Sequence, residues 1–232
     1  MKQTSRREFL SFLSKSVAMG ALGSAPVLAA DGPKTAITPD QALALMRKGN
    51  VDFLADKYDA KLSDRVRRLE IAKGQKPFCV LVGCSDSRVS PEILFGRGLG
   101  ELFIVRVAGN TVDNTALGSI EYAVAELGVP LILVLGHEKC GAVQAAVDIV
   151  TKNAVYPGAI SDMVEPIVPA VLKARTQSGD LLDNSVRENV KRVVSRLKSS
   201  QALLAAPIKS GKLKVVGARY DLDDGKVEFI GV

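Results

Sequence analysis

Short runs of apolar residues alternate with segments of helical periodicity through the middle of the 232-residue chain. Runs at residues 78–82, 102–107 and 131–135 are rich in Val, Ile and Leu, which is typical of strands buried on both faces of a parallel sheet. A helical pattern over residues 115–127, ended by Gly128, separates the last two runs. The alternation predicts right-handed β-α-β crossovers within one sheet.

The flanking regions complete an α/β fold. Helical patterns follow residue 140, at residues 142–150, 163–176 and 184–198. Residues 213–216 and 226–230 predict two final strands in a hairpin. We therefore expect a mostly parallel central β-sheet flanked by helices, with a C-terminal β-hairpin.

A helical arm is expected before the sheet. Thr38, Pro39 and Asp40 indicate the start of a helix that runs to about Lys48, where Gly49-Asn50 indicates its end. A second helical stretch follows over about residues 52–72. The length of the chain and its 47% hydrophobic content suit one α/β domain at residues 31–232, divided into an N-terminal helical arm (31–72) and an α/β core (73–232).

The first 30 residues do not fit that core. Arg6-Arg7 precedes an apolar run over residues 17–28 and the small residues Ala29-Ala30, which is the layout of a twin-arginine signal peptide. The alternatives are a membrane anchor and an ordinary Sec signal. An anchor needs about 20 consecutive apolar residues, and this run is shorter and contains Pro26. We expect export by the twin-arginine route, removal of the signal and a periplasmic location.

Charge argues against nucleic-acid partners. The chain has a formal charge of +6, but residues 1–30 hold four basic and one acidic residue, which leaves 27 basic and 24 acidic residues in the mature chain. That balance is too even for a nucleic-acid surface. The mature chain also has no Trp and no second long apolar run. No DNA, RNA or membrane-spanning partner is expected.

The candidate chemistry lies in the only histidine and two of the three cysteines. His137 stands three residues before Cys140, so both are expected on one face at the start of a helix, and Cys84 lies upstream. Both motifs follow predicted strands and should share the carboxyl edge of the sheet. Cys84 and Cys140 could form a disulfide, but their polar neighbours favour a metal. Cys79 lies in an apolar run and is expected to be a buried, inert thiol.

Two charged residues beside Cys84 extend this site. Asp86 and Arg88 alternate with Cys84 and can face the same cavity. Three ligands of the type Cys2His with an open fourth position are typical of catalytic zinc, and water or Asp86 would complete the set. Arg88 would keep Asp86 ionised and aimed at zinc-bound hydroxide. An ordinary salt bridge in a loop is the alternative for this pair.

Both motifs resemble a known family. Residues 84–89 (Cys-Ser-Asp-Ser-Arg-Val) and 137–141 (His-Glu-Lys-Cys-Gly) are similar to the two signature motifs of the β-class carbonic anhydrases, in their plant-like branch. The resemblance continues through residues 102–110, 119–123 and 216–221, and covers the chain from about Thr38 to its end.

The resemblance implies a role for each matching residue. Cys84, His137 and Cys140 would bind one Zn2+ per subunit, and Asp86 with Arg88 would form the catalytic pair, with Asp86 as a fourth zinc ligand in a closed state. The matching substrate residues are Gln75, Phe103 and Tyr122. Without the family resemblance, Gln75 would be interpreted as a turn residue, Phe103 as part of the packed core and Tyr122 as a contact on a helix face. Ala108 stands where this branch often has valine.

The implied function is zinc-dependent, reversible hydration of CO2 to bicarbonate and a proton, by attack of zinc-bound hydroxide on CO2. The family also implies a homodimer or homotetramer with the site near the subunit interface. A noncatalytic zinc-binding bicarbonate sensor or assembly module on the same fold is the alternative. A thiol redox protein is disfavoured because the chain has no Cys-x-x-Cys motif.

Overall fold

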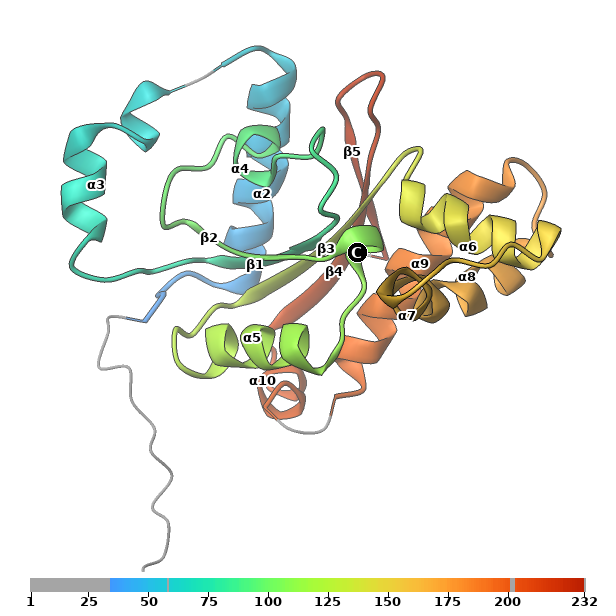
Figure 1. Ribbon diagram of the computed structural model, residues 1–232. Helices are drawn as coiled ribbons and strands as arrows, with labels where there is room; N and C mark the ends of the chain where they lie inside the picture. The colour runs from blue at the N-terminus through green and yellow to red at the C-terminus, as the bar shows by residue number, and fades with distance from the viewer. Residues whose placement is uncertain (1–33, 58, 201–202, 232) are drawn as a thin grey trace, which may run out of the picture.

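One five-stranded sheet forms the centre of the molecule (Figure 1). The computed structural model describes residues 34–57, 59–200 and 203–231, so the predicted signal peptide lies outside the described residues. In chain order the strands are β1 (Cys79–Gly83), β2 (Leu102–Arg106), β3 (Leu131–His137), β4 (Lys214–Tyr220) and β5 (Val227–Ile230). Their spatial order is β2-β1-β3-β4-β5, parallel except for β5, which pairs antiparallel with β4. The predicted mostly parallel sheet and C-terminal hairpin are confirmed.

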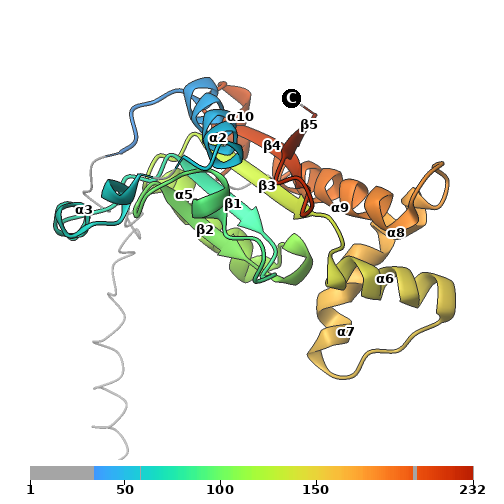
Figure 2. The same ribbon diagram turned by 90° about the horizontal axis from the view of Figure 1, so that it is seen from above.

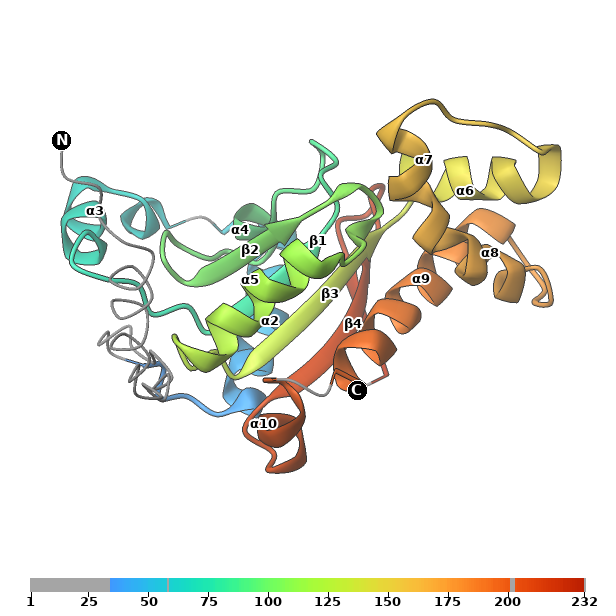
Figure 3. The ribbon, with the colours of Figure 1, turned by 60° about the horizontal axis from the view of Figure 1, so that its bottom comes forward.

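Helices cover both faces of this sheet. The described α-helices are α2 (Pro39–Leu54), α3 (Arg65–Ile71), α4 (Pro91–Leu94), α5 (Asn114–Ala125), α6 (Gly141–Lys152), α7 (Ala159–Val164), α8 (Val168–Ala174), α9 (Leu181–Lys198) and α10 (Ala205–Lys209). Short 3-10 turns lie at η1 (Ala60–Leu62), η2 (Ala108–Asn110) and η3 (Glu165–Ile167). Figure 3 shows α5, α9 and α10 on one face and α2 on the other. Figure 2 shows α6, α7 and α8 beyond the carboxyl end of β3.

The central strands are continuously apolar because both of their faces are buried. Alternate residues point to opposite faces of a sheet. Val80 and Ile132 accordingly join the core under α5 and α9, whereas Leu81 and Leu133 join the core under α2 and α4. Every residue of β1 and β3 is buried. The carboxyl ends of these two strands are therefore held rigidly side by side.

The arm departs from its predicted form. Helix α2 does not end at Gly49-Asn50 but continues to Leu54. A Cβ on Gly49 would lie 1.7 Å from the Phe95 carbonyl oxygen, so this glycine permits close packing rather than ending the helix. The Asn50 side chain donates hydrogen bonds to the Leu94 and Gly225 carbonyl groups. Tertiary contacts thus explain both residues.

Other predicted helices are shorter or divided. The stretch expected at residues 52–72 contains only η1 and α3 after the end of α2, so one long helix was a wrong prediction. The stretch expected at residues 163–176 is divided among the end of α7, η3 and α8, where Pro166 and Pro169 have no N–H to donate. No helix among the described residues is both long and apolar enough to cross a bilayer.

A buried carboxylate fastens α9 to α8. The Glu188 side chain is 3% exposed, and its two oxygens each lie 2.7 Å from an ammonium group, one of Lys173 and one of Lys191. Burial raises the pKa of this carboxyl, but hydrogen bonds from Lys173, Lys191 and Gln177 outweigh it and lower the pKa to about 2.

The Glu188 carboxylate should make the free energy of unfolding depend on pH in the acid range. Because the pKa is lower in the folded state, its contribution is complete above the unfolded pKa of about 4.3 and is lost as the pH falls toward 2. We expect Glu188→Gln to lose about 3 kcal/mol of unfolding free energy at pH 7. Urea titrations of both proteins from pH 7 to pH 2 would measure the difference. A difference that stays constant over this range would contradict the assignment.

Candidate metal centre

Two adjacent strand ends and a helix start bring Cys84, His137 and Cys140 together. Cys84 follows β1, His137 is the last residue of β3, and Cys140 caps the start of α6. The expectation that His137 and Cys140 share a helix face was wrong. A turn joins them instead, and Lys139 in that turn has a φ of 51°. Spacing indicated their proximity correctly, but not the element that produces it.

The three side chains form a closely spaced, buried group. Their candidate ligand atoms all lie within 4.8 Å of one another. The Cys84 and Cys140 Sγ atoms are 3.9 Å apart, and all three cysteines of the chain are free thiols. Two thiolates on a tetrahedral zinc with bonds of about 2.3 Å would be about 3.8 Å apart. The sulfur separation therefore fits a shared ion and not a disulfide bond.

The imidazole of His137 has one nitrogen engaged and one without a partner. Nδ1 lies 2.8 Å from the Glu138 carbonyl oxygen and can donate its proton there. This contact leaves a lone pair on Nε2, which is buried and has no hydrogen-bond partner within the described chain. A buried polar atom without a partner is costly. Metal ligation would satisfy Nε2, and the Nδ1 contact is the usual means of orienting a ligating histidine.

The two thiols influence each other's ionisation. A hydrogen bond from Cys140 lowers the pKa of Cys84 to about 4, against the opposing effect of burial. The same contact, together with burial, raises the pKa of Cys140 above its usual range. One thiol is thus poised as a thiolate beside a protonated neighbour. A divalent cation would offset the repulsion between two thiolates, since a coordinating thiol loses its proton.

Three residues without an assigned role support the Cys84 loop. The Gly109 N–H donates to Cys84 Sγ at 3.2 Å, while Asn189 Nδ2 donates to the Gly109 carbonyl at 2.8 Å. Arg106 donates to the Cys84 and Asp86 carbonyl groups, both at 2.7 Å. Arg106 is a charged residue at the end of the otherwise apolar strand β2, and this position was a signal in the sequence that its side chain has a specific role. Nothing local distinguishes Asn189, which lies 80 residues from its partner.

Gly109 is required at its position for two reasons. Its φ of 72° lies in the left-handed region, and a Cβ would come within 2.6 Å of the Ile167 side chain. Glycine alone adopts this conformation without strain and leaves that space free. The backbone can therefore bring its N–H to the Cys84 sulfur.

Asp86 and Arg88 form the pair expected from their spacing. Arg88 donates from Nε and from a terminal nitrogen to the two carboxylate oxygens of Asp86, at 2.9 and 2.8 Å. These hydrogen bonds hold the pKa of Asp86 well below its usual range. Asp86 Oδ2 lies 3.8 Å from His137 Nε2. An ionised carboxylate therefore borders the Cys-His-Cys group while its charge is engaged by arginine.

The three predicted substrate residues do not join this group within one chain. Gln75 is exposed in the loop before β1. Phe103 pairs in register with Val80, four residues before Cys84, which places it about 13 Å along the strand from Cys84. Tyr122, on α5, is 46% exposed and packs near Phe103, with ring centroids 6.4 Å apart.

Known proteins are similar to this chain in sequence and in fold. The family model described as carbonic anhydrase matches residues 79–227. Carbonic anhydrase 2 of Mycobacterium tuberculosis is 40% identical over 188 residues, covering 81% of this chain and 91% of that protein. The chain belongs to the β-class carbonic anhydrases and is an enzyme of that kind.

Solved structures of the class agree with this assignment. A tetrameric β-carbonic anhydrase from Sordaria macrospora has a TM-score of 0.64 and 25% identity, covering 71% of this chain and 86% of that one. A Coccomyxa β-carbonic anhydrase in complex with acetazolamide has a TM-score of 0.62 and 27% identity, covering 84% and 87%. The predicted fold and family are thus confirmed.

Proposed function

We propose that this chain catalyses the reversible hydration of CO2 to bicarbonate and a proton, with one Zn2+ held by Cys84, His137 and Cys140. One observation carries the proposal. His137 has a buried Nε2 without a hydrogen-bond partner, and its candidate ligand atom lies within 4.8 Å of the sulfur atoms of two free thiols. Zinc, when bound, supplies a Lewis acid that makes water nucleophilic near neutral pH. Two thiolates and an imidazole are a donor set that zinc accepts, with a fourth position left for reaction.

Asp86 and Arg88 are proposed as the catalytic pair. Arg88 engages both carboxylate oxygens of Asp86, which keeps the carboxylate ionised and fixes its direction. So fixed, Asp86 can accept a hydrogen bond from the attacking nucleophile and orient it. Release from Arg88 would let the carboxylate turn toward the metal, because Oδ2 is already 3.8 Å from the ligating nitrogen. That movement would close the fourth position.

A second copy of the chain is proposed to complete the substrate pocket. Gln75, Phe103 and Tyr122 lie away from the metal group of their own chain, and β2 is one of the two edge strands of the sheet. Val66 and Leu69 of the arm are 74% and 59% exposed, which is costly for apolar side chains gathered on one short helix. A homodimer, or a homotetramer built from dimers, would cover this surface and bring the aromatic residues to a partner's metal site.

The oligomer can be tested with a matched pair of substitutions. Val66→Asp should weaken association by at least about tenfold, because burying an unpaired carboxylate in the interface is unfavourable. Val155→Asp places the same charge on a residue that is 92% exposed in the loop between α6 and α7, and should leave assembly unchanged. Sedimentation velocity across protein concentrations would measure both. A wild-type protein that stays monomeric at micromolar concentration would contradict the proposal.

The function itself is tested by stopped-flow CO2 hydration with the purified, zinc-loaded protein across pH. We expect activity that depends on zinc and rises with pH. Two thiolate ligands would raise the pKa of zinc-bound water above the value it has with three imidazole ligands. A rate already constant through neutral pH would contradict the second expectation. A protein that binds one zinc yet shows no hydration at any pH would favour the bicarbonate sensor or assembly module.

Export is proposed from the sequence alone. Arg6-Arg7 and the apolar run that follows support the twin-arginine route and a periplasmic location. Fractionation of cells that express the full chain, compared with an Arg6→Lys, Arg7→Lys variant, would test this. Equal amounts of periplasmic protein from both would contradict the proposal.

A further inference from the structure

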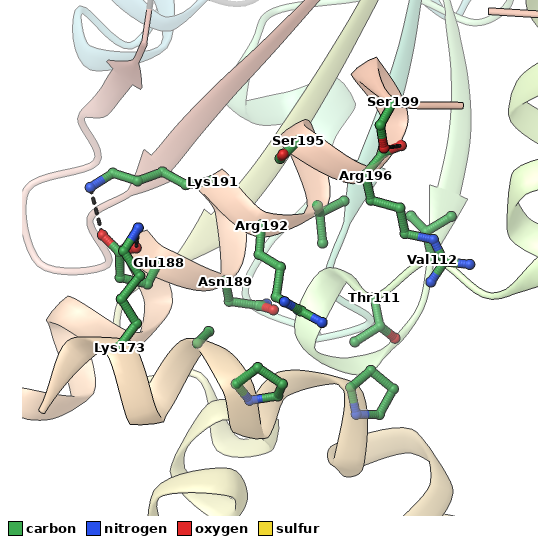
Figure 4. Close-up of a pocket in the computed structure, with 14 residues that line it drawn as sticks. Thr111, Val112, Lys173, Glu188, Asn189, Lys191, Arg192, Ser195, Arg196 and Ser199 are labelled. Carbon is green, nitrogen blue, oxygen red and sulfur yellow. Dashed lines mark hydrogen bonds and ion pairs between the residues drawn. The ribbon is translucent and has the colours of Figure 1, made fainter. Parts of the chain in front are cut away.

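A cavity of about 470 Å³ lies between α8, α9 and the residues that follow η2 (Figure 4). No member of the Cys-His-Cys group lines it, and neither does Asp86 or Arg88. The volume falls within the range of small-molecule sites, about 300–1,000 Å³. Four of the lining side chains are basic and one is acidic: Lys173, Lys191, Arg192, Arg196 and Glu188.

The positive charges of this cavity are not equally engaged. Glu188 accepts from both Lys173 and Lys191, so these three residues form a largely self-compensating cluster at one end. Among the described residues, none forms an ion pair or hydrogen bond with the guanidinium group of Arg192 or Arg196. Figure 4 shows Arg192 extending from α9 toward the turn that carries Thr111, and Arg196 reaching toward Val112. The excess positive charge is therefore concentrated at the Thr111 end.

This arrangement costs energy in the absence of a ligand. Arg192 and Arg196 are four residues apart on α9, so they lie on one helix face, where like charges repel each other and destabilise the helix. An anion between them would reverse the sign of this interaction. Hydroxyl groups that could donate to the same anion also line the cavity, from Thr111 and Ser195.

We propose that this cavity binds a phosphate group, either inorganic phosphate or the phosphate of a small monoester. Guanidinium groups match phosphate oxygens with paired hydrogen bonds, and a doubly charged anion suits two free arginines better than a monoanion does. Val112, Pro166, Pro169 and Ala170 supply an apolar wall. A monoester with an apolar body would use this wall as well, so it should bind more tightly than inorganic phosphate.

Isothermal titration calorimetry of the full, zinc-loaded chain tests the proposal with two probes, inorganic phosphate and phenyl phosphate. At pH 7.5 phenyl phosphate is mainly a dianion, because the second ionisation of a phosphate monoester has a pKa of about 6. We expect saturable binding of phenyl phosphate that weakens at least about tenfold in Arg192→Ala, Arg196→Ala, since this variant loses both guanidinium donors of the charge-assisted hydrogen bonds to phosphate. Tighter binding of phenyl phosphate assigns the cavity to monoesters, and equal affinity assigns it to inorganic phosphate.

The matched control removes the same charge outside the cavity. Lys198→Ala, Lys209→Ala alters two exposed lysines that do not line the cavity, and should change the affinity less than twofold. All variants retain the metal ligands, so an anion that binds only at zinc would bind the arginine variant as tightly as the wild type. That result overturns the proposal, as does a lack of saturable binding or equal weakening in the lysine control. Circular dichroism confirms that each variant is folded.

Discussion

Replacing Cys140 with alanine should remove both the bound metal and the activity, whereas the same replacement at Cys79 should remove neither. Both thiols are buried, with 1% of Cys140 and 0% of Cys79 exposed, so each substitution removes a buried sulfur atom. Only Cys140 shares its surroundings with Cys84 and His137. Changing a residue that merely supports a metal ligand typically costs 10–100-fold, so loss of the ligand itself should cost more than about 100-fold in kcat/KM.

The measurement combines zinc content by mass spectrometry with stopped-flow hydration of CO2. Cys79→Ala should keep one zinc per chain and lose about 1 kcal/mol of stability, because a small cavity replaces the thiol. Burial raises the pKa of Cys79 far above its usual range, so this thiol has no reactive role to lose. A full equivalent of zinc in Cys140→Ala would exclude the proposed ligand set.

The sheet could be predicted because its sequence signal is local. Residues of β1 and β3 are apolar without interruption since both faces are covered, and such runs are read directly from the chain. Cys84 and His137 follow from the same signal, because parallel neighbours end at one edge. The proximity of Cys84, His137 and Cys140 was therefore predictable from the positions of the strand ends and the residue chemistry together.

The errors concern residues whose roles depend on distant contacts. Gly49-Asn50 has the composition of a helix end, yet Asn50 bonds to Gly225, 175 residues away, and the helix continues. Asn189 supports Gly109 from a separate helix, with no local sign of that role. Gln75, Phe103 and Tyr122 were identified only by resemblance, and one chain does not gather them at the metal group. Residues that would reach the site from a second copy of the chain leave no signal in the local sequence pattern.

Converting Asp86 to asparagine should lower kcat/KM by about 100-fold or more while leaving the metal bound, since positioned proton-transfer groups contribute about 10²–10⁴-fold. The amide keeps the size of the carboxylate but loses its charge and one acceptor oxygen. The side chain of Arg88 then has one acceptor oxygen at residue 86 instead of two, and no anion orients the nucleophile. Asp162→Asn, at an exposed residue in the first turn of α7, makes the same change away from the site and should leave both zinc and rate unaltered.

Arg88→Ala should lower the activity by a different route, which distinguishes the two members of the pair. Without the two side-chain hydrogen bonds from Arg88, the Asp86 carboxylate remains charged and keeps only the backbone N–H of residue 88 as a donor. The carboxylate can then turn toward the metal, so zinc-edge spectroscopy should detect a carboxylate in place of water at the fourth position at neutral pH. Adding Asp86→Asn to this variant should remove that ligand without restoring the rate. If Arg88→Ala left the zinc-edge spectrum unchanged, Arg88 would not be holding Asp86 away from the metal, and the proposed closed state would lose its structural basis.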